Sequence, residues 1–210
     1  MPLAMNMNLR NFIDEKVNML GDEAIEVKGL ILTETDLQCA LYRKLYEIEE
    51  LINYEPTNDE GVLILSHKLH TEITWYDNEG KLRIRPDITL MDPSSLTILS
   101  GVNGTRLPSK GFQSTGGGII FELKFDRNKQ KISQQTIDGI FKDIRNYKKL
   151  LDKFNDEGVI DEMYGYFIFF IKSSESEVNQ EIINEIQEEF DTRGIDPEKY
   201  SFIYKFLDVP

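Results

Sequence analysis

The stretch "MYGYFIFFI" at residues 163–171 places the strongest constraint on the fold of this chain. All nine positions are apolar, aromatic or glycine, so an extended chain here is apolar on both faces. A strand of this kind is typical of the centre of a sheet that is covered on both sides. We therefore predict an α/β fold, in which a mixed central β-sheet is flanked by helices.

The remaining elements follow from the periodicity of the apolar residues. Leucine and isoleucine at three- and four-residue steps predict a helix over 33–53, with Thr33 and Asp36 as its capping residues. Further helices are predicted over 131–154 and 177–191. Strands are predicted over 62–76, with a break near Ser66 as an alternative, and over 80–91, 118–126, 163–171 and 200–206. Residues 8–32 are weakly patterned, with a short helix or strand around residues 9–17 as the alternatives. We expect a single domain over 1–210 with its core at about 33–173 and a Gly/Ser/Thr/Pro-rich loop insertion at 92–117.

Composition limits the class of protein. No apolar run is long enough to cross a membrane, and the N-terminal residues lack the pattern of a signal peptide. The single cysteine excludes an internal disulfide and fits a reducing cytoplasm, so we expect a cytoplasmic protein with no membrane partner. The formal net charge of −13 argues against a surface that attracts nucleic acid everywhere, although residues 126–153 carry more bases than acids.

Polar residues interrupt two of the predicted strands. In "GGGIIFELKF" (116–125), alternation puts Ile119, Phe121, Leu123 and Phe125 on a core face and Glu122 and Lys124 together on a polar face. In the strand before it, Asp87 follows Pro86, which lacks a backbone N–H and indicates an edge or a bulge. An ordinary Glu–Lys pair that stabilises the sheet by less than about 1 kcal/mol is the alternative interpretation of Glu122 and Lys124.

The motif Pro86-Asp87 with Glu122-Leu123-Lys124, set in the order helix, three strands, helix, strand, resembles the PD-(D/E)XK nuclease superfamily. The resemblance covers about residues 33–173 and implies a restriction-endonuclease-like αβββαβ core, here with an extra C-terminal helix and strand. It also implies an enzyme, a Mg²⁺-dependent nuclease that takes Mn²⁺ as a substitute and acts on DNA in a defence, restriction or repair system. A homodimer or a partner subunit is expected with it.

The resemblance assigns Asp87 and Glu122 as metal ligands and Lys124 as a catalytic residue. Phosphodiester hydrolysis adds negative charge to an anion, and Mg²⁺ held by carboxylates supplies positive charge and lowers the pKa of water. Lys124 would orient or deprotonate the attacking water, or stabilise the charge of the transition state.

Family members often carry a further glutamate on the first helix, for which Glu34, Asp36 and Glu47 are the candidates. Glu34 extends the stripe of Leu37 and Leu41, so we choose it as the fourth catalytic residue. A first-turn acid favoured by the helix dipole is the alternative.

Other residues near the motif carry secondary expectations. Arg127, Lys129 and Lys131 follow the motif strand and are expected to contact phosphates of the nucleic acid. Tyr147 fits either a core aromatic or a site residue, and His67 and His70 lie out of phase on a strand, which argues against a paired metal site. A catalytically silent binding or regulatory module with the same fold is the alternative function, and the retention of all three motif residues argues against it.

Overall fold

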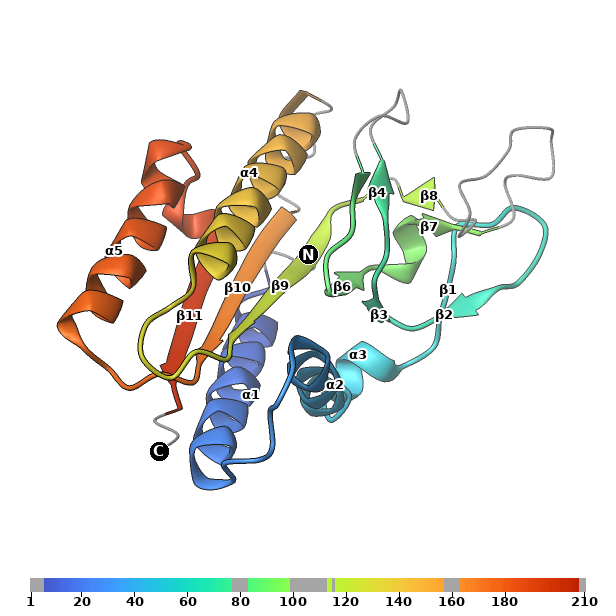
Figure 1. The fold of residues 1–210 in the computed structure, drawn as a ribbon. Helices are drawn as coiled ribbons and strands as arrows, with labels where there is room; N and C mark the ends of the chain where they lie inside the picture. The colour runs from blue at the N-terminus through green and yellow to red at the C-terminus, as the bar shows by residue number, and fades with distance from the viewer. Residues whose placement is uncertain (1–5, 77–82, 99–112, 115, 157–162, 208–210) are drawn as a thin grey trace.

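A five-stranded mixed sheet forms the centre of the protein (Figure 1). The computed structural model describes residues 6–76, 83–98, 113–114, 116–156 and 163–207. The strand order is β11-β10-β9-β6-β3. Strands β9, β10 and β11 are parallel to one another, β6 runs antiparallel to β9, and β3 runs antiparallel to β6. The strands are β3 (Leu69–Thr71), β6 (Ile88–Met91), β9 (Gly118–Asp126), β10 (Met163–Ile171) and β11 (Tyr200–Phe206).

Helices cover both faces of this sheet. Neighbouring parallel strands need a crossover connection, and α4 (Gln134–Asp156) and α5 (Glu177–Thr192) provide it between β9, β10 and β11. These two helices share one apolar core with one face of the sheet. Helices α1 (Met7–Glu26) and α2 (Glu34–Leu45) share a second core with the opposite face (Figure 1). The α/β prediction is therefore confirmed at the level of a mixed sheet flanked by helices.

The strand β9 contributes to both cores. Phe121 and Leu123 pack in the core under α1 and α2, whereas Ile120 packs in the core under α4 and α5. The sequence predicted one core face and one polar face for this strand. The predicted polar face, which carries Glu122 and Lys124, is also a core face, because α4 covers it. In register, Phe167 and Phe169 of β10 lie beside Glu122 and Lys124. Two polar side chains therefore stand among apolar neighbours.

The predicted strands 118–126, 163–171 and 200–206 are confirmed to within a few residues, and so are the predicted helices 131–154 and 177–191. The strands predicted over 62–76 and 80–91 are wrong in extent, because the described residues there form shorter pieces: β3 and β6 join the main sheet, and the other pieces form two-stranded pairs beside it. The short elements are α3 (Glu49–Ile52), β1 (Glu55–Pro56), β2 (Leu65–Ser66), β4 (Trp75–Tyr76), β5 (Arg83–Ile84), η2 (Pro93–Ser95), β7 (Leu96–Thr97), β8 (Gln113–Ser114) and η5 (Pro197–Lys199).

The N-terminal half differs from the sequence prediction in two further respects. The predicted helix 33–53 is divided into α2 and α3, although Thr33 does cap α2 by accepting a hydrogen bond from the Asp36 amide at 3.1 Å. The weakly patterned segment 8–32 contains the 20-residue helix α1, which buries Leu9, Ile13, Val17, Leu20 and Ala24. Most of the predicted insertion, residues 99–112 and 115, lies outside the described residues.

Among the helices that the structure describes, none combines the length and the apolar character that a membrane span requires.

A buried carboxylate fixes the connection from β9 to α4. Asp126 is 1% exposed. Its carboxylate accepts hydrogen bonds from the Asn128 and Ser133 amides at 2.8 and 2.9 Å and from the Ser133 and Thr136 hydroxyls at 2.8 and 2.7 Å. A carboxylate with four donors is well satisfied although it is buried. Asp126 therefore fixes where α4 begins relative to the motif strand.

We expect Asp126→Ala to lower the free energy of unfolding by about 2–4 kcal/mol, because four donors lose a charged acceptor. Urea denaturation checks this value. Asp138→Ala, which removes an exposed acid of α4, should change stability by less than about 0.5 kcal/mol. Equal effects of the two substitutions would contradict the role given to Asp126.

Candidate active site

The motif strands separate at Pro86, and this separation creates the site. The ladder between β6 and β9 runs from Met91 opposite Gly118 to Ile88 opposite Phe121. The Asp87 amide still donates to the Phe121 carbonyl at 3.0 Å, but the ladder cannot continue through proline, which has no N–H. The Asp87 carboxylate instead accepts a hydrogen bond from the Leu123 amide at 2.7 Å. This bond places Asp87 against the residue between Glu122 and Lys124.

The backbone of Asp87 is held from two further directions. The Gln38 side-chain amide on α2 donates to the Asp87 carbonyl at 2.7 Å, and the Glu72 amide donates to it at 3.1 Å. Glu72 has φ 52°, the sole positive value for a non-glycine residue in the described part of the chain. A non-glycine residue rarely adopts this conformation, and such residues concentrate at functional sites.

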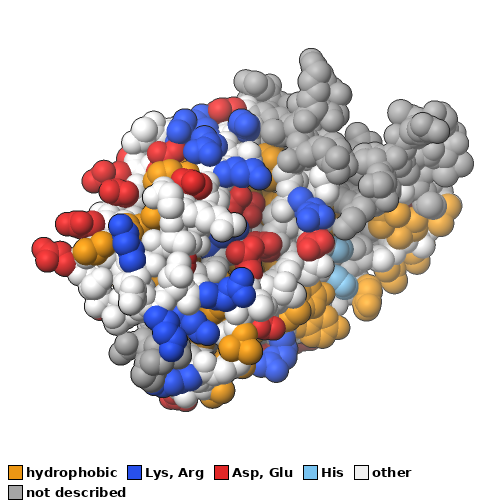
Figure 2. All heavy atoms as spheres, in the orientation of Figure 1, with side chains coloured by type: hydrophobic (Ala, Val, Ile, Leu, Met, Phe, Trp, Pro, Cys, Tyr) orange, Lys and Arg blue, Asp and Glu red, His pale blue; other side chains and the backbone are white. Residues whose placement is uncertain are grey.

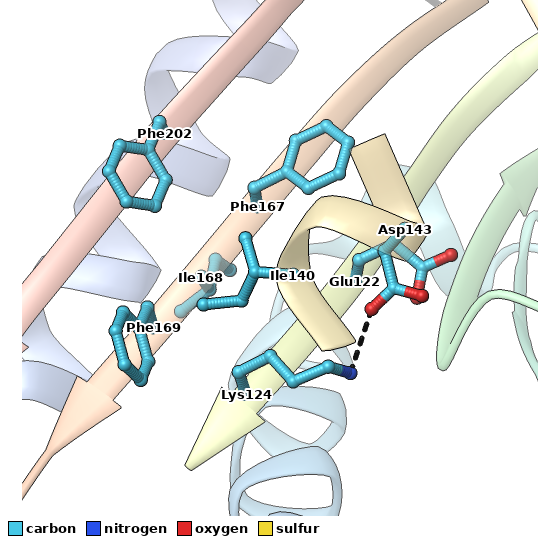
Figure 3. A pocket seen from close by; sticks show the side chains of 8 residues that line it. All are labelled: Glu122, Lys124, Ile140, Asp143, Phe167, Ile168, Phe169 and Phe202. Atoms are coloured by element: carbon cyan, nitrogen blue, oxygen red, sulfur yellow. Dashed lines mark ion pairs between the residues drawn. The ribbon is translucent and has the colours of Figure 1, made fainter. Parts of the chain in front are cut away.

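Glu122 is a buried carboxylate to which none of the described residues donates a hydrogen bond. Its side chain points from β9 toward α4 and is 9% exposed. It lines a small cavity of about 10 Å³, a volume that accommodates about one water molecule, with Lys124, Asp143, Phe167 and Phe169 (Figure 3). No donor within the described ranges bonds to this carboxylate, whereas buried carboxylates in folded proteins are normally paired.

Lys124 is the cationic group of the cluster. Its ammonium pairs with Asp143 of α4 at 2.9 Å, donates to the Leu123 carbonyl at 2.9 Å and lies 3.7 Å from Glu34 of α2. Figure 3 shows Lys124, Glu122 and Asp143 pointing toward one another. The site therefore brings together side chains from two strands and two helices.

The pKa values reflect four acids around one base. Burial raises the pKa of Asp87 to about 6, and the Glu34 and Asp143 carboxylates add to the rise. The hydrogen bond from Leu123 and the charge of Lys124 lower this pKa but do not outweigh burial. Burial also raises the pKa of Glu122 well above its ordinary value, and the Asp143 and Asp87 carboxylates add to the rise. Burial alone would lower the pKa of Lys124, but the neighbouring carboxylates, Asp143 first, outweigh it and raise that pKa. Lys124 is consequently an ammonium ion at neutral pH.

The three candidate acids of the first helix have different surroundings. Glu34 lies near Lys124, whereas Asp36 accepts a hydrogen bond from the Leu32 amide at 3.1 Å and Glu47 pairs with Lys16 at 2.6 Å. Of these three, Glu34 is the acid that the fold brings to the motif residues.

Two residues of the site were missed by the sequence analysis, although a helical signal existed for each. Asp143 lies three residues after Ile140 and four before Tyr147, both on the buried stripe of α4. Gln38 lies one turn after Glu34 and so shares its helix face.

A larger groove of about 480 Å³ adjoins the site at the end of β9. Glu34, Lys124, Arg127, Asn128, Gln135 and Gly139 are among the residues that line it. Arg127 is thus part of the groove, whereas Lys129 and Lys131 are exposed and are not part of its lining. Figure 2 shows acidic side chains at the centre of this face, with lysine and arginine side chains around them.

Tyr147 is a core residue outside this site. It is fully buried, packs edge-on against Phe167 with ring centroids 5.5 Å apart, and donates its hydroxyl to the Lys199 carbonyl. The core alternative for Tyr147 is therefore correct.

The phase argument for the histidines is wrong. The strand predicted there is interrupted between Ser66 and Leu69, and the rings of His67 and His70 stack with centroids 5.0 Å apart. Burial, with His67 as a second cause, lowers the pKa of His70 to about 4, so its ring is neutral at pH 7.

The donor set fits a hard divalent cation. Mg²⁺ is commonly held by one or two carboxylates and completes its shell with water and substrate oxygens. Asp87 directly precedes β6 and Glu122 lies on the neighbouring strand β9, and no described residue donates to the buried Glu122 carboxylate. Within the described ranges, no group of three or more His, Cys, Asp or Glu side chains is arranged to hold a metal ion. The residues therefore fit a cation held by two carboxylates rather than a closed protein cage.

Comparisons of this chain with protein-family models, with curated proteins and with solved structures gave no match.

The raised pKa of Asp87 predicts how stability depends on pH. The folded carboxyl has a pKa of about 6 and the ordinary value is 3.8, so the folded chain binds more protons between these pH values. Rising pH therefore lowers the free energy of unfolding across this window. In the absence of divalent cations, Asp87→Asn should be more stable than wild type by about 2 kcal/mol at pH 8 and not at pH 4.

Urea denaturation at the two pH values measures this difference. Asp138→Asn, a change at an exposed acid, serves as the control and should show no such pH dependence. A constant difference between Asp87→Asn and wild type from pH 4 to pH 8 would contradict the prediction.

Proposed function

We propose that this chain is a Mg²⁺-dependent nuclease that hydrolyses phosphodiester bonds in DNA. The observation that carries the proposal is the hydrogen bond from the Leu123 amide to the Asp87 carboxylate at 2.7 Å. It joins two motif segments that lie far apart in the sequence and puts an acid beside Glu122 and Lys124. An incidental Glu–Lys pair in a sheet would not need this third residue.

The order of elements supports a restriction-endonuclease-like core. Helix α2 is followed by β3, β6 and β9 of one sheet, then by α4 and β10, and Asp87 and Glu122 belong to the second and third of these strands or their edges. This is the order of the PD-(D/E)XK superfamily, to which the motif has a resemblance. The substrate class and the use of Mg²⁺, with Mn²⁺ as a substitute, come from that resemblance.

The proposal gives each residue a role. Asp87 and Glu122 hold the cation, which supplies positive charge to the phosphate and makes water more acidic. Lys124 acts as a charged donor to the phosphoryl oxygens in the transition state, because its ammonium is paired with Asp143 and its pKa is raised. A lysine in this state is poorly suited to remove a proton from water. Glu34 lies at the mouth of the groove and helps to orient the ammonium.

Cleavage assays test the proposal. Wild type incubated with plasmid, linear and single-stranded DNA and with RNA should cut DNA when Mg²⁺ or Mn²⁺ is present. Lys124→Ala, Asp87→Asn and Glu122→Gln should each reduce the rate by about 10²–10³-fold or more, because each removes charge stabilisation from the reacting phosphate. Lys142→Ala, which removes an exposed lysine of α4, is the matched control and should retain activity.

The nuclease assignment is wrong if wild type cuts none of these substrates, or if Lys124→Ala cuts as fast as wild type. Far-ultraviolet circular dichroism shows whether each variant is folded.

The position of Arg127 in the groove leads to a separate prediction about binding. In the Lys124→Ala background, where cleavage is suppressed, Arg127→Ala should weaken the binding of a DNA duplex and reduce the salt-dependence slope by about 1. Fluorescence anisotropy across a salt series measures both quantities. Arg193→Ala removes an arginine that pairs with Glu189 on α5 and should leave the slope unchanged. An unchanged slope for Arg127→Ala would remove Arg127 from the phosphate contacts.

A further inference from the structure

The single ammonium of the site has several carboxylates near it, and it pairs most closely with one that is not a motif residue. Lys124 Nζ lies 2.9 Å from Asp143 Oδ2 and 3.7 Å from Glu34 Oε1. Asp143 is the more enclosed of the two, with a side chain 16% exposed against 47% for Glu34. This ion pair lies in a shielded place, where the attraction between opposite charges is stronger than in water.

The aliphatic stem and the ammonium of Lys124 both lie against helix α4. Gly139 and Asp143 lie one turn apart on α4, so they share a helix face. A methyl group at Gly139 would lie 3.5 Å from Cε of Lys124, so the lysine stem passes directly over this glycine. Gly139 thus borders the stem, and Asp143 holds the charged end.

The contact between Lys124 and Asp143 affects Glu122, because no described residue donates a hydrogen bond to the Glu122 carboxylate. Glu122 and Lys124 project from the same face of β9, and Glu122 has no hydrogen-bond donor among the described residues. Without Asp143, the ammonium would be left with two carboxylates, the more exposed Glu34 at 3.7 Å and the buried Glu122, to which no described residue donates. An ammonium bonded to Glu122 would occupy the oxygen atoms that a divalent cation needs.

We propose that Asp143 is a positioning residue that holds the Lys124 ammonium away from Glu122 and so keeps Glu122 open for a divalent cation. The proposal rests on the nuclease function for the identity of the cation. The contact that it describes exists in the metal-free chain.

A structure of metal-free Asp143→Ala tests the positioning directly. The Lys124 ammonium should move to within about 3 Å of a Glu122 oxygen, the usual length of a charge-assisted hydrogen bond. An ammonium that stays beside α4 or turns toward the groove would overturn the proposal. If Asp143→Ala does not fold, the isosteric Asp143→Asn serves in its place, because it removes the charge and keeps the shape.

Metal titration by calorimetry, without nucleic acid, tests the consequence. Asp143→Ala should weaken Mg²⁺ binding about 10–100-fold, the usual effect of losing an outer-shell partner. The double variant Asp143→Ala/Lys124→Ala should bind within about threefold of wild type, because nothing then competes for Glu122. Asp138→Asn removes the same charge from an exposed position of α4 and should bind as wild type does.

The outcomes separate the two proposals. Wild-type affinity in Asp143→Ala, or a double variant as weak as the single one, would overturn the positioning role, and the second result would make Asp143 itself a ligand. If wild type binds neither Mg²⁺ nor Mn²⁺, the proposed nuclease function fails, and the structure of Asp143→Ala alone decides where Asp143 holds the lysine.

Discussion

The hydrogen bond between the Leu123 amide and the Asp87 carboxylate is the contact on which the site depends. The backbone ladder between β6 and β9 ends at Ile88, and the Leu123 N–H would otherwise be an unpaired donor, at a cost of about 1–3 kcal/mol. The carboxylate satisfies this donor with a side chain in place of a backbone carbonyl. The same bond therefore closes a gap in the sheet and sets an acid beside Glu122 and Lys124.

The charge balance of the site explains why it would recruit a cation. Asp87, Glu122, Asp143 and Glu34 surround Lys124, so one ammonium serves four carboxyl groups in a partly buried place. Burying charged groups whose charge is not fully balanced by partners is unfavourable, and folded proteins retain such groups mainly at functional sites. A divalent cation is the group whose charge would relieve this imbalance, and the Asp143–Lys124 pair leaves Glu122 available to it.

The sequence predicted the regular parts of the fold better than the segments between them. The double-sided apolarity of 163–171 and the helix stripes determine the layers, because burial of apolar surface dominates there. The short strands between residues 55 and 97 escaped prediction, since turns and Pro86 interrupt them and their pairing depends on distant partners. Asp143 escaped prediction because it was counted with a solvated charged segment, although its spacing from Ile140 and Tyr147 places it on the buried side. Charge alone does not show which acids of a helix face inward, whereas spacing relative to the apolar stripe does.

Under the proposed function, the two hollows beside Lys124 would determine how a substrate approaches. On one side, the small cavity holds Glu122 and Asp143 against Phe167 and Phe169 and has room for about one water molecule. On the other side, the groove lined by Glu34 and Arg127 is about 480 Å³ and is open to solvent. Lys124 lines both, so in the proposed nuclease the ammonium would stand between an anion in the groove and the carboxylates of the small cavity. This order matters because bare carboxylates repel a phosphate, and a lysine held at the boundary by Asp143 offsets that repulsion where the two charges first come close.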